Sequence, residues 1–534
     1  MKSFLSISFV LFLLCLVDSK SLKPNSFKKR VFQDLFGKLN PRITGDPGEP
    51  LILTDLIEAG KLDEAQNKSL VEGLDTDIKS YSGYLTVDKE HNSNIFFWFF
   101  PSQGNASSDP VILWLQGGPG SSSMFGLFKE NGPLLLNDGN LGIRETSWNK
   151  NNSVIYIDQP AGTGWSFTTD GYASNQTKVA TDLYAALQQF FTLFYQYQHQ
   201  DFYVTGESYA GKYVPAISYK IHQANPEAKL KINLKGLAIG NGYTDPIEQI
   251  HYAEYVYQLG LMDLYTTNLL KQTEARVVEE IKSEEYDEAY DLWSDIIDTI
   301  QQFTEIDIYN YLTIKRSHAD ETDLNEFFSK EEVRKAIHVG NTDFNRPDEV
   351  YDHLAQDFPK SEAWKVAELL KYYRVLIYSG QTDLMIPYAL TVNYLQKLKF
   401  PGSDDYEKAE RIVWHDDADR QVVAGYAKTA GKLTEIMVRN AVVEEIKSEE
   451  YDEAYDLWSD IIDTIQQFTE IDIYNYLTIK RSHADETDLN EFFSKEEVRK
   501  AIHVGNTDFN RPDEVYDHLH KTSLNQRHGK SQNF

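Results

Sequence analysis

A block of 78 residues occurs twice in this chain of 534 residues, and it restricts the possible folds more than any other feature. Residues 277–354 recur without a change as residues 442–519, an offset of 165 positions. Solenoid repeats diverge, and they need three or more units of roughly 20–50 residues to build a continuous core. Two identical units separated by 87 unrelated residues do not meet that requirement. We therefore interpret the repeat as a recent duplication or an error in assembling the coding sequence, and residues 520–534 as a non-structural tail.

The net charge of −30 comes mostly from the repeated block. Each copy holds 21 acidic and 7 basic residues, so the two copies together contribute −28. The acidity therefore says little about a substrate. A net charge of this sign argues against nucleic acid as a partner, because the phosphate backbone would repel the protein.

The first residues are typical of a signal peptide, which we expect to span residues 1–19. Met1-Lys2-Ser3 leads into an apolar run from Phe4 to Val17, and a short charged start followed by roughly 7–15 apolar residues marks such a segment. A membrane-spanning helix needs about 20 residues, so we expect an exported protein without a membrane anchor. The only cysteine, Cys15, lies in this segment. The mature chain is therefore predicted to have no disulfide and no cysteine-ligated metal, and we expect no cofactor.

Four Asn-X-Ser/Thr sequons would accept glycans in an exported protein wherever they are exposed, although one or two can stay unused. They begin at Asn67, Asn105, Asn151 and Asn175. Together with the signal peptide they predict a secreted or lysosomal protein.

Strands and helices alternate over most of the chain. Short apolar runs bounded by glycine, proline or polar residues predict buried strands at 94–100, 111–115, 154–157, 202–204 and 375–378. Residues 177–197 have helical spacing and precede one of these strands. Such alternation predicts an α/β fold with a mostly parallel sheet. The segment from about 250 to 354 is mostly helical in pattern and is interpreted as an insertion that caps the sheet.

The sequence Gly206-Glu207-Ser208-Tyr209-Ala210-Gly211 directly follows the strand predicted at 202–204. A serine between small residues on a strand-to-helix turn is typical of a nucleophile elbow. The simpler alternative is a glycine-rich turn without a chemical role.

A second glycine-rich loop, Gln116-Gly117-Gly118-Pro119-Gly120, follows the strand predicted at 111–115. Its backbone N–H groups, with that of Tyr209, could face a developing oxyanion, and losing one such donor typically costs about 10²–10³ in rate. A structural turn and a phosphate cradle are the alternatives. The loop lacks the Lys-Ser/Thr of a P-loop, which argues against phosphate.

Further stretches extend the pattern over about 390 residues, from near Pro50 to Ala441. They are Ser82–Val87, Gln116–Ser123, Asp158–Gly164, Gly206–Pro215 and Gly240–Gly242. On these motifs the chain resembles the serine carboxypeptidases, and most closely the vitellogenic-carboxypeptidase-like branch. The resemblance implies an α/β-hydrolase fold with a helical cap insertion. It also implies removal of C-terminal residues from peptides through an acyl-enzyme.

Carried over residue by residue, the resemblance assigns roles to seven positions. Ser208 resembles the nucleophile, Gly118 and Tyr209 the oxyanion donors, and Gln116, Gly117, Glu130 and Glu207 the group that grips the C-terminal carboxylate of the substrate. Two adjacent carboxyl groups cannot both ionise cheaply, so one stays protonated in acid and can donate a hydrogen bond. An acidic pH optimum follows from this.

The acid of the catalytic triad resembles Asp383, which follows the strand predicted at 375–378. A single aspartate in such a place is more often a capping residue. Its position after the serine and before the expected histidine follows the hydrolase order Ser…Asp…His, which favours the catalytic role.

The chain departs from the family at the residue that should supply the histidine. The family continues Val438-Arg439-Asn440-Ala441 with Gly-His-Met-Val-Pro and a closing helix, whereas here the second copy begins and Val443 holds the place of the histidine. No other histidine has the needed context. Serine without its base is a weak nucleophile, so we predict a loss of about 10⁴–10⁶ in rate. Losing the closing helix is also expected to expose apolar surface, unless the second copy docks in place of the first.

The sequence therefore divides into seven expected parts. They are the signal peptide 1–19, an N-terminal extension or pro-segment 20–75, the first hydrolase part 76–249, the helical cap insertion 250–355, the second hydrolase part 356–441, the copy 442–519 and the tail 520–534.

Three readings of the function stay open. Either the gene encodes a working carboxypeptidase of which this chain is a misassembled or mis-spliced version, or the chain is an inactive relative that binds peptides or partners. The identity of the copies favours the first reading, because a functional second domain would have drifted. Acyl transfer uses the same serine chemistry and is a third reading. The expected partners are peptide C-termini, and the sequence is compatible with a homodimer.

Overall fold

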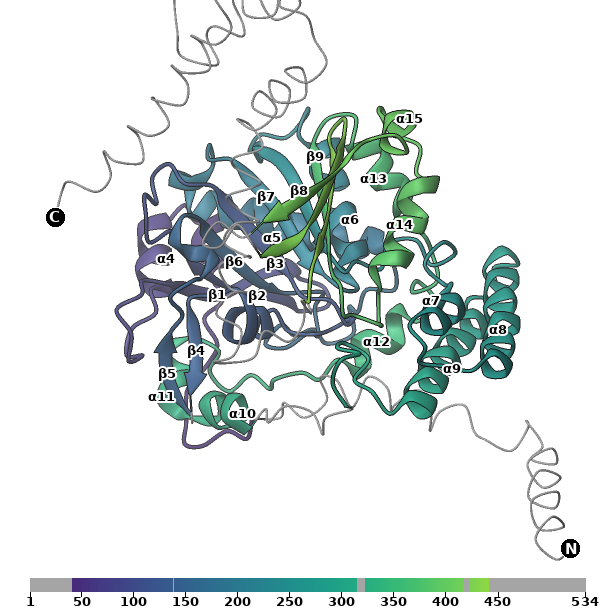
Figure 1. Ribbon diagram of the computed structural model, residues 1–534. Helices are drawn as coiled ribbons and strands as arrows, with labels where there is room; N and C mark the ends of the chain where they lie inside the picture. The colour runs from purple at the N-terminus through teal and green to yellow at the C-terminus, as the bar shows by residue number, and fades with distance from the viewer. Residues whose placement is uncertain (1–40, 138, 315–321, 416–421, 441–534) are drawn as a thin grey trace, which may run out of the picture. The chain divides into compact units, whose positions relative to one another are not determined.

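The computed structural model describes residues 41–137, 139–314, 322–415 and 422–440 (Figure 1). The signal peptide, the second copy, the tail and Val443 lie outside the described residues.

A ten-stranded sheet lies at the centre, in the order β1-β2-β6-β3-β7-β8-β9-β12-β11-β10, beside a separate two-stranded sheet of β4 and β5. The strands are β1 (Tyr81–Asp88), β2 (Ser93–Phe100), β3 (Val111–Leu115), β4 (Leu134–Asn137), β5 (Asn140–Ile143), β6 (Ser153–Asp158), β7 (Phe202–Glu207), β8 (Leu234–Gly240), β9 (Arg374–Gly380), β10 (Arg411–His415), β11 (Val423–Ala430) and β12 (Leu433–Val438). The six strands from β6 to β12 are parallel, and antiparallel pairs complete both edges. The predicted mostly parallel central sheet is confirmed.

The five strands predicted from apolar runs are β2, β3, β6, β7 and β9. Every residue of β2, β3 and β6 is buried, which is why these strands read as continuous apolar runs and not as alternating ones. The helix predicted at 177–197 is α5 (Gln176–Leu193), followed by a short 3₁₀ turn, Tyr195–Tyr197. It begins at Asn175, whose side chain caps the first turn by accepting from the N–H of Lys178 at 3.0 Å.

Helices cover the sheet and fill the insertion (Figure 1). The remaining helices are α3 (Thr54–Glu58), α4 (Leu62–Ser69), α6 (Ala210–Ala224), α7 (Tyr252–Gln258), α8 (Leu264–Lys282), α9 (Tyr286–Thr304), α10 (Thr322–Ser329), α11 (Glu331–Ala336), α12 (Asp348–Leu354), α13 (Ala363–Leu369), α14 (Tyr388–Lys397) and α15 (Ser403–Tyr406). Helix α6 packs on β7 and β8, directly after the strand that leads to Ser208. None of the helices in the described ranges combines the length and apolar character that crossing a bilayer requires.

Part of the segment expected as an N-terminal extension packs into the central core. Leu53, Ile57 and Ala65, on or beside α3 and α4, belong to the same buried cluster as the sheet. The Leu53 N–H donates to the carbonyl of Tyr84 in β1 at 2.9 Å.

The helical insertion lies in two places. Helices α7, α8 and α9 pack against one another, and α10 and α11 lie apart from them, beside β4 and β5 (Figure 1). Between α11 and α12 the chain is bound to the hydrolase core. There the Asn345 N–H donates to the Gly164 carbonyl at 2.7 Å, and Ser82 of β1 donates to the Ile337 carbonyl at 2.8 Å. The first copy of the repeated block is therefore an integral part of the fold.

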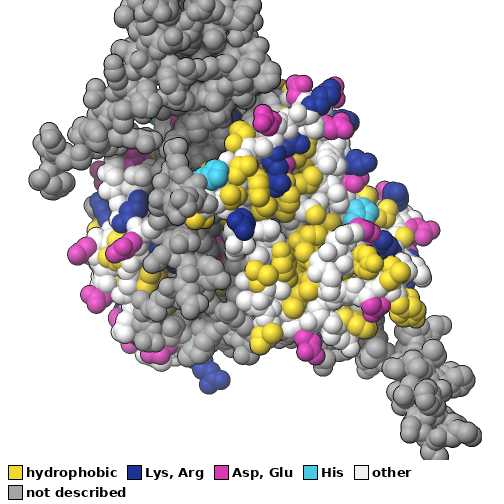
Figure 2. Space-filling model, in the orientation of Figure 1, with side chains coloured by type: hydrophobic (Ala, Val, Ile, Leu, Met, Phe, Trp, Pro, Cys, Tyr) yellow, Lys and Arg dark blue, Asp and Glu magenta, His cyan; other side chains and the backbone are white. Residues whose placement is uncertain are grey.

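The edge of the sheet at β10 carries exposed apolar side chains. Ile412 and Val413 in β10 are 43% and 46% exposed, and Val422, just before β11, is 40% exposed. Hydrophobic side chains gather on the face of the molecule over the β10–β12 region (Figure 2).

Candidate active site

The site centres on Ser208, at the sharp turn between β7 and α6. Its backbone has a φ of 57°. Residues other than glycine seldom adopt this left-handed conformation, and where they do it is often at a functional turn. The Ser208 N–H donates to the Gly240 carbonyl at 3.0 Å, and its carbonyl accepts from the Tyr243 N–H at 2.9 Å. A Cβ on Gly206 would lie 2.5 Å from the Leu115 carbonyl oxygen, so only glycine fits there. The turn has the geometry of a nucleophile elbow.

The glycine-rich loop after β3 passes directly over this turn. A Cβ on Gly117 would lie 2.6 Å from the backbone nitrogen of Tyr209 and 2.8 Å from Cβ of Ser208. Gly118 adopts a φ of 107°. The structure thus brings both predicted oxyanion donors, Gly118 and Tyr209, to the nucleophile turn.

Asp158 stabilises this loop through hydrogen bonds. Its carboxylate accepts from the Ser122 hydroxyl at 2.7 Å, the Ser123 N–H at 2.8 Å and the Trp165 N–H at 2.9 Å. The Ser123 hydroxyl in turn accepts from the Gln116 N–H at 3.1 Å.

Two carboxyl groups and an amide form a buried cluster beside the serine. Gln116 Nε2 donates to Glu207 at 2.6 Å and to Glu130 at 3.3 Å, and Gln116 Oε1 accepts from the Trp114 indole at 2.9 Å. Glu130 is the last residue of a π-helical turn, Gly126–Glu130. Burial is the largest cause of a pKa of Glu207 well above its ordinary value, followed by the negative charge of Glu130 and a hydrogen bond to that carboxyl. The cluster therefore keeps a proton to a higher pH than an isolated glutamate would.

Asp383 lies in the loop after β9, as expected. It accepts hydrogen bonds from Asn241 Nδ2 at 2.7 Å, from the Met385 N–H at 2.7 Å and from the Ile386 N–H at 3.1 Å. Burial raises the pKa of Asp383 to about 7 despite these bonds. Within residues 41–137, 139–314, 322–415 and 422–440, no histidine ring is hydrogen-bonded to it.

A pocket opens beside the serine. It is lined by Gly118, Ser208, Tyr209, Tyr243, Trp293, Tyr309, Phe358, Met385 and Ile386. The backbone of Met385 and Ile386 contacts Asp383, so the pocket links the candidate nucleophile to the loop of the candidate triad acid. Aromatic and aliphatic side chains dominate the lining, which suits an apolar group.

Sequence reasoning missed Asn241 and the pocket. Asn241 lies in the Gly240-Asn241-Gly242 motif, and its place at the end of β8 was the signal that could have identified it. The pocket residues come from seven separate segments of the chain, and no local pattern marks them. No cluster of metal-ligating side chains occurs in the described part of the chain.

Several buried carboxyl groups make stability depend on pH. Burial raises the pKa of Asp158 to about 6 and those of Glu274 and Asp383 to about 7, and it also raises that of Glu207. The folded state therefore holds more protons than the unfolded state above about pH 4. The stability that protonation provides is fully present below the unfolded pKa values and is lost as pH rises through the folded ones.

We expect the free energy of unfolding to fall between pH 5 and pH 7.5 at constant ionic strength, by about 1.4 kcal/mol per pH unit for each extra proton held, and the urea midpoint to fall with it. Glu274 lies outside the site and accepts from the Ala253 N–H at 2.6 Å. Glu274→Gln should therefore keep the fold. It should also remove the contribution of one carboxyl group to the fall of stability with pH. A midpoint that stays constant or rises over this range would contradict the assignment.

The fold and the turn at Ser208 are those of an α/β-hydrolase with a nucleophile on a strand-to-helix elbow. Residues 71–444 match the family model described as serine carboxypeptidase. The chain belongs to the serine carboxypeptidase family. The matched region ends three residues into the second copy.

Relatives agree with this placement, and a solved structure agrees with the fold. The chain is 50% identical over 410 residues to the venom serine carboxypeptidase of Apis mellifera, covering 74% of this chain and 87% of that one. It is 41% identical over 442 residues to the vitellogenic carboxypeptidase of Aedes aegypti, covering 80% and 92%. The fold is similar to that of Kex1(Δ)p, a prohormone-processing carboxypeptidase from Saccharomyces cerevisiae, with a TM-score of 0.65, 23% identity and coverage of 75% and 96%.

Proposed function

We propose that the Ser208 site is built to remove C-terminal residues from peptides through an acyl-enzyme. The observation that carries the proposal is the buried cluster of Gln116, Glu130 and Glu207. Glu207 directly precedes the serine in the sequence. A proton held between the two carboxyl groups lets them donate to the carboxylate of a peptide C-terminus, which a pair of ionised carboxylates would repel.

The rest of the constellation supports serine chemistry. Ser208 Oγ would attack the carbonyl carbon of the last peptide bond. The N–H groups of Gly118 and Tyr209 would stabilise the oxyanion. Asp383, oriented by Asn241, is the proposed acid of a triad whose histidine belongs at position 443.

We propose further that this chain binds peptides and hydrolyses them slowly, because Val443 cannot accept the serine proton. Deprotonation by a general base is what makes serine a strong nucleophile. A peptide-binding relative without turnover is the second candidate function. It is favoured by the intact carboxyl cluster beside a nucleophile without its base.

The binding step tests the proposal without requiring turnover. We expect N-acetyl-Phe-Leu to bind at pH 5 at least about tenfold more tightly than its C-terminal amide. Only the free acid offers a charged carboxylate to the protonated cluster, and hydrogen bonds to a charged acceptor are stronger than those to a neutral amide. Affinity for the free acid should fall by up to tenfold per pH unit once the pH passes the pKa of the pair. Isothermal titration calorimetry from pH 4.5 to pH 8 measures both effects.

A double variant, Glu130→Gln with Glu207→Gln, remains neutral and keeps the acceptors that Gln116 contacts. Its affinity for the free acid should not change over the same pH range. Glu274→Gln is the matched control, since it neutralises a buried carboxyl outside the site and should keep the pH dependence. Equal affinity for the acid and the amide in the unaltered chain would refute the function.

We also propose export and glycosylation, in keeping with a venom relative and a vitellogenic one. All four sequon asparagines are exposed on the described surface, at Asn67, Asn105, Asn151 and Asn175. Oδ1 of Asn175 caps α5, and Nδ2, the atom that would carry a glycan, donates to the Ser174 hydroxyl at 3.5 Å on the exposed surface.

A further inference from the structure

A second cavity, of about 340 Å³, is lined by the loop after β8, by α13 and by the end of α14. It shares no lining residue with the pocket beside Ser208, and the proposed chemistry uses none of its side chains. Its volume lies within the range of small-molecule sites, about 300–1,000 Å³. We call it the α13–α14 cavity.

The α13–α14 cavity is lined by charges of both signs in equal number. Its carboxylates and its ammonium groups are those of Asp245, Glu248, Glu368, Lys371, Lys397 and Lys399. Lys371 donates to Glu368 at 2.5 Å. Among the residues that the structure describes, the other two acids and the other two lysines form no ion pair. Two acids from the loop and two lysines from the end of α14 therefore have their charges available for a ligand.

The loop that carries the two acids is fixed before any ligand binds. Gln249 Oε1 accepts from the N–H groups of Thr244 at 2.8 Å and Asp245 at 2.9 Å, and its Nε2 donates to the Gly242 carbonyl at 2.8 Å. The Thr244 carbonyl accepts from the Glu362 N–H at 2.9 Å, which ties the loop to the start of α13. Fixed carboxylates lose little conformational freedom when they bind a cation.

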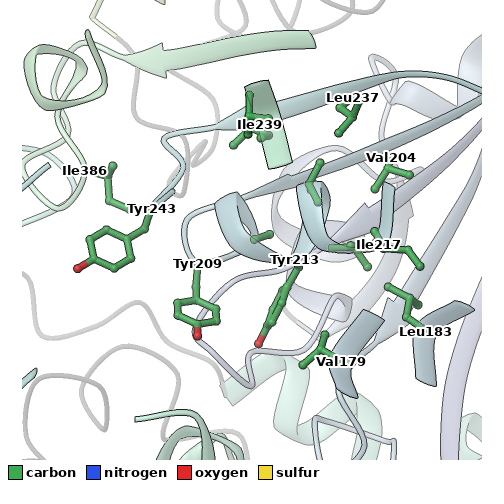
Figure 3. Close-up of a cluster of buried hydrophobic side chains, with 14 of the residues drawn as sticks. Val179, Leu183, Val204, Tyr209, Tyr213, Ile217, Leu237, Ile239, Tyr243 and Ile386 are labelled. Atoms are coloured by element: carbon green, nitrogen blue, oxygen red, sulfur yellow. The ribbon is translucent and has the colours of Figure 1, made fainter. Parts of the chain in front are cut away.

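The core holds the same loop from its other end, and the two acids repel each other. Ile239 of β8 and Tyr243 in the segment after it are buried side chains that anchor the chain leading to Asp245 (Figure 3). Burial, and then the negative charge of Glu248, raise the pKa of Asp245. An ammonium group between the two carboxylates would relieve this repulsion.

The cavity also offers an aromatic surface. Trp364 on α13 is 54% exposed, and its ring packs edge-on against Tyr219 with the centroids 5.0 Å apart. Leu398, just after α14, is buried in the lining. An indole held by a neighbouring ring provides apolar contact area for a large side chain.

The charges select the class of ligand. A phosphate or a simple carboxylate would be repelled by the acids of the loop, and a polyamine by the lysines at the end of α14. A molecule that carries one charge of each sign satisfies both groups. With an apolar side chain for the indole, that molecule is an amino acid.

We infer that the α13–α14 cavity binds a free amino acid with a large apolar side chain. The ammonium group of the ligand pairs with Asp245 and Glu248, and its carboxylate pairs with Lys397 and Lys399. Its side chain lies against Trp364. The inference goes beyond the proposed function: a carboxypeptidase would release a ligand of this class, but binding in this cavity requires no turnover.

Calorimetry at pH 7 with the full chain tests the inference, with L-phenylalanine as the probe. Phenethylamine lacks its carboxylate, and 3-phenylpropanoate lacks its ammonium group. We expect L-phenylalanine to bind with a Kd of about 1 mM or tighter. Each analogue should bind at least about fivefold more weakly, because it leaves one set of charges without a partner. Equal or tighter binding of either analogue would overturn the inference, and so would tighter binding of the dipeptide Leu-Phe.

Two double variants locate the site by the sign of the charge removed. Asp245→Asn with Glu248→Gln should weaken L-phenylalanine at least about fivefold without weakening 3-phenylpropanoate. Lys397→Gln with Lys399→Gln should weaken L-phenylalanine equally without weakening phenethylamine. Both lysines are exposed, so this variant keeps the test decisive if the acid variant fails to fold.

Two controls separate the cavity from other sites. Lys61→Gln with Lys68→Gln removes the same charge at the ends of α4 and should leave the affinity for L-phenylalanine within about twofold. The variant of Asp245 and Glu248 should bind N-acetyl-Phe-Leu at pH 5 within about twofold of the unaltered chain, since that peptide has no ammonium group. L-phenylalanine binding that is unchanged in both cavity variants would place the amino acid elsewhere and overturn the inference, whatever the fate of the proposed function.

Discussion

Replacing residues 442–534 with Gly-His-Met-Val-Pro and a closing helix of the family type is expected to raise kcat/KM for peptide hydrolysis by at least about 10⁴-fold. The other two proposed members of the triad already have defined positions. Ser208 lies at the turn between β7 and α6, and three hydrogen bonds orient Asp383. A histidine between them would take the serine proton and return it to the leaving amine. The expected gain is large because, on the proposed function, the base is the one member of the triad that this chain lacks.

The matched control is the same graft with Gly-Ala-Met-Val-Pro, which restores the closing helix without the imidazole. Its kcat/KM should stay near that of the unaltered chain, even if the helix raises stability by covering apolar surface at the sheet edge. Ser208→Ala in the histidine graft should abolish the gain. Full activity in the unaltered chain, dependent on Ser208, would show that another group serves as the base and would contradict the proposal.

The graft should also change the titration of Asp383. A protonated imidazole beside a carboxylate favours the ionised form, so the pKa of Asp383 should fall from about 7. The folded state would then hold one proton fewer near neutral pH, and the fall in urea midpoint between pH 5 and pH 7.5 should become shallower.

The parts of the site that could be predicted are those that local geometry imposes. A strand, a tight turn and a helix need small residues around Ser208, and the loop at Gly117 needs glycine because the nucleophile turn lies against it. These requirements leave their mark within a few neighbouring residues. The carboxyl cluster joins positions up to 91 residues apart, and it was identified only through the family resemblance.

Residues that act across long loops could not be predicted. Asn241 binds Asp383 across 142 positions, and Lys212 contacts Asp357 across 145. A lysine in an amphipathic helix normally points to solvent, whereas this one is buried and donates to carbonyls of the distant 357–360 segment. The antiparallel edge of β10, β11 and β12 escaped prediction for a related reason, because β10 and part of β11 lack the continuous apolar run of a buried strand.

Arg334→Ala is expected to destabilise the protein by about 3 kcal/mol or more, whereas the identical change at Arg499 in the second copy should cost less than about 0.5 kcal/mol. Arg334 is 0% exposed. It donates to the carbonyls of Gly340 at 3.0 Å, Phe328 at 3.2 Å and Thr342, and its guanidinium lies 4.8 Å from the ring centroid of Trp165. Alanine would leave these buried carbonyls without their donor and a cavity beside the tryptophan.

The pair of variants is matched because the two copies have the same sequence, so only their positions in the fold differ. Urea unfolding followed by tryptophan fluorescence measures the effect on the part that contains Trp165. If only the first copy can occupy the place beside Trp165, Arg334→Ala loses stability and Arg499→Ala does not. The double variant, Arg334→Ala with Arg499→Ala, is then as unstable as Arg334→Ala. If the copies exchange places, each single variant is rescued by the intact copy and only Arg334→Ala with Arg499→Ala is destabilised. The second pattern would overturn the assignment of residues 277–354 as the copy that is integral to the fold and would make the duplication a source of alternative folds.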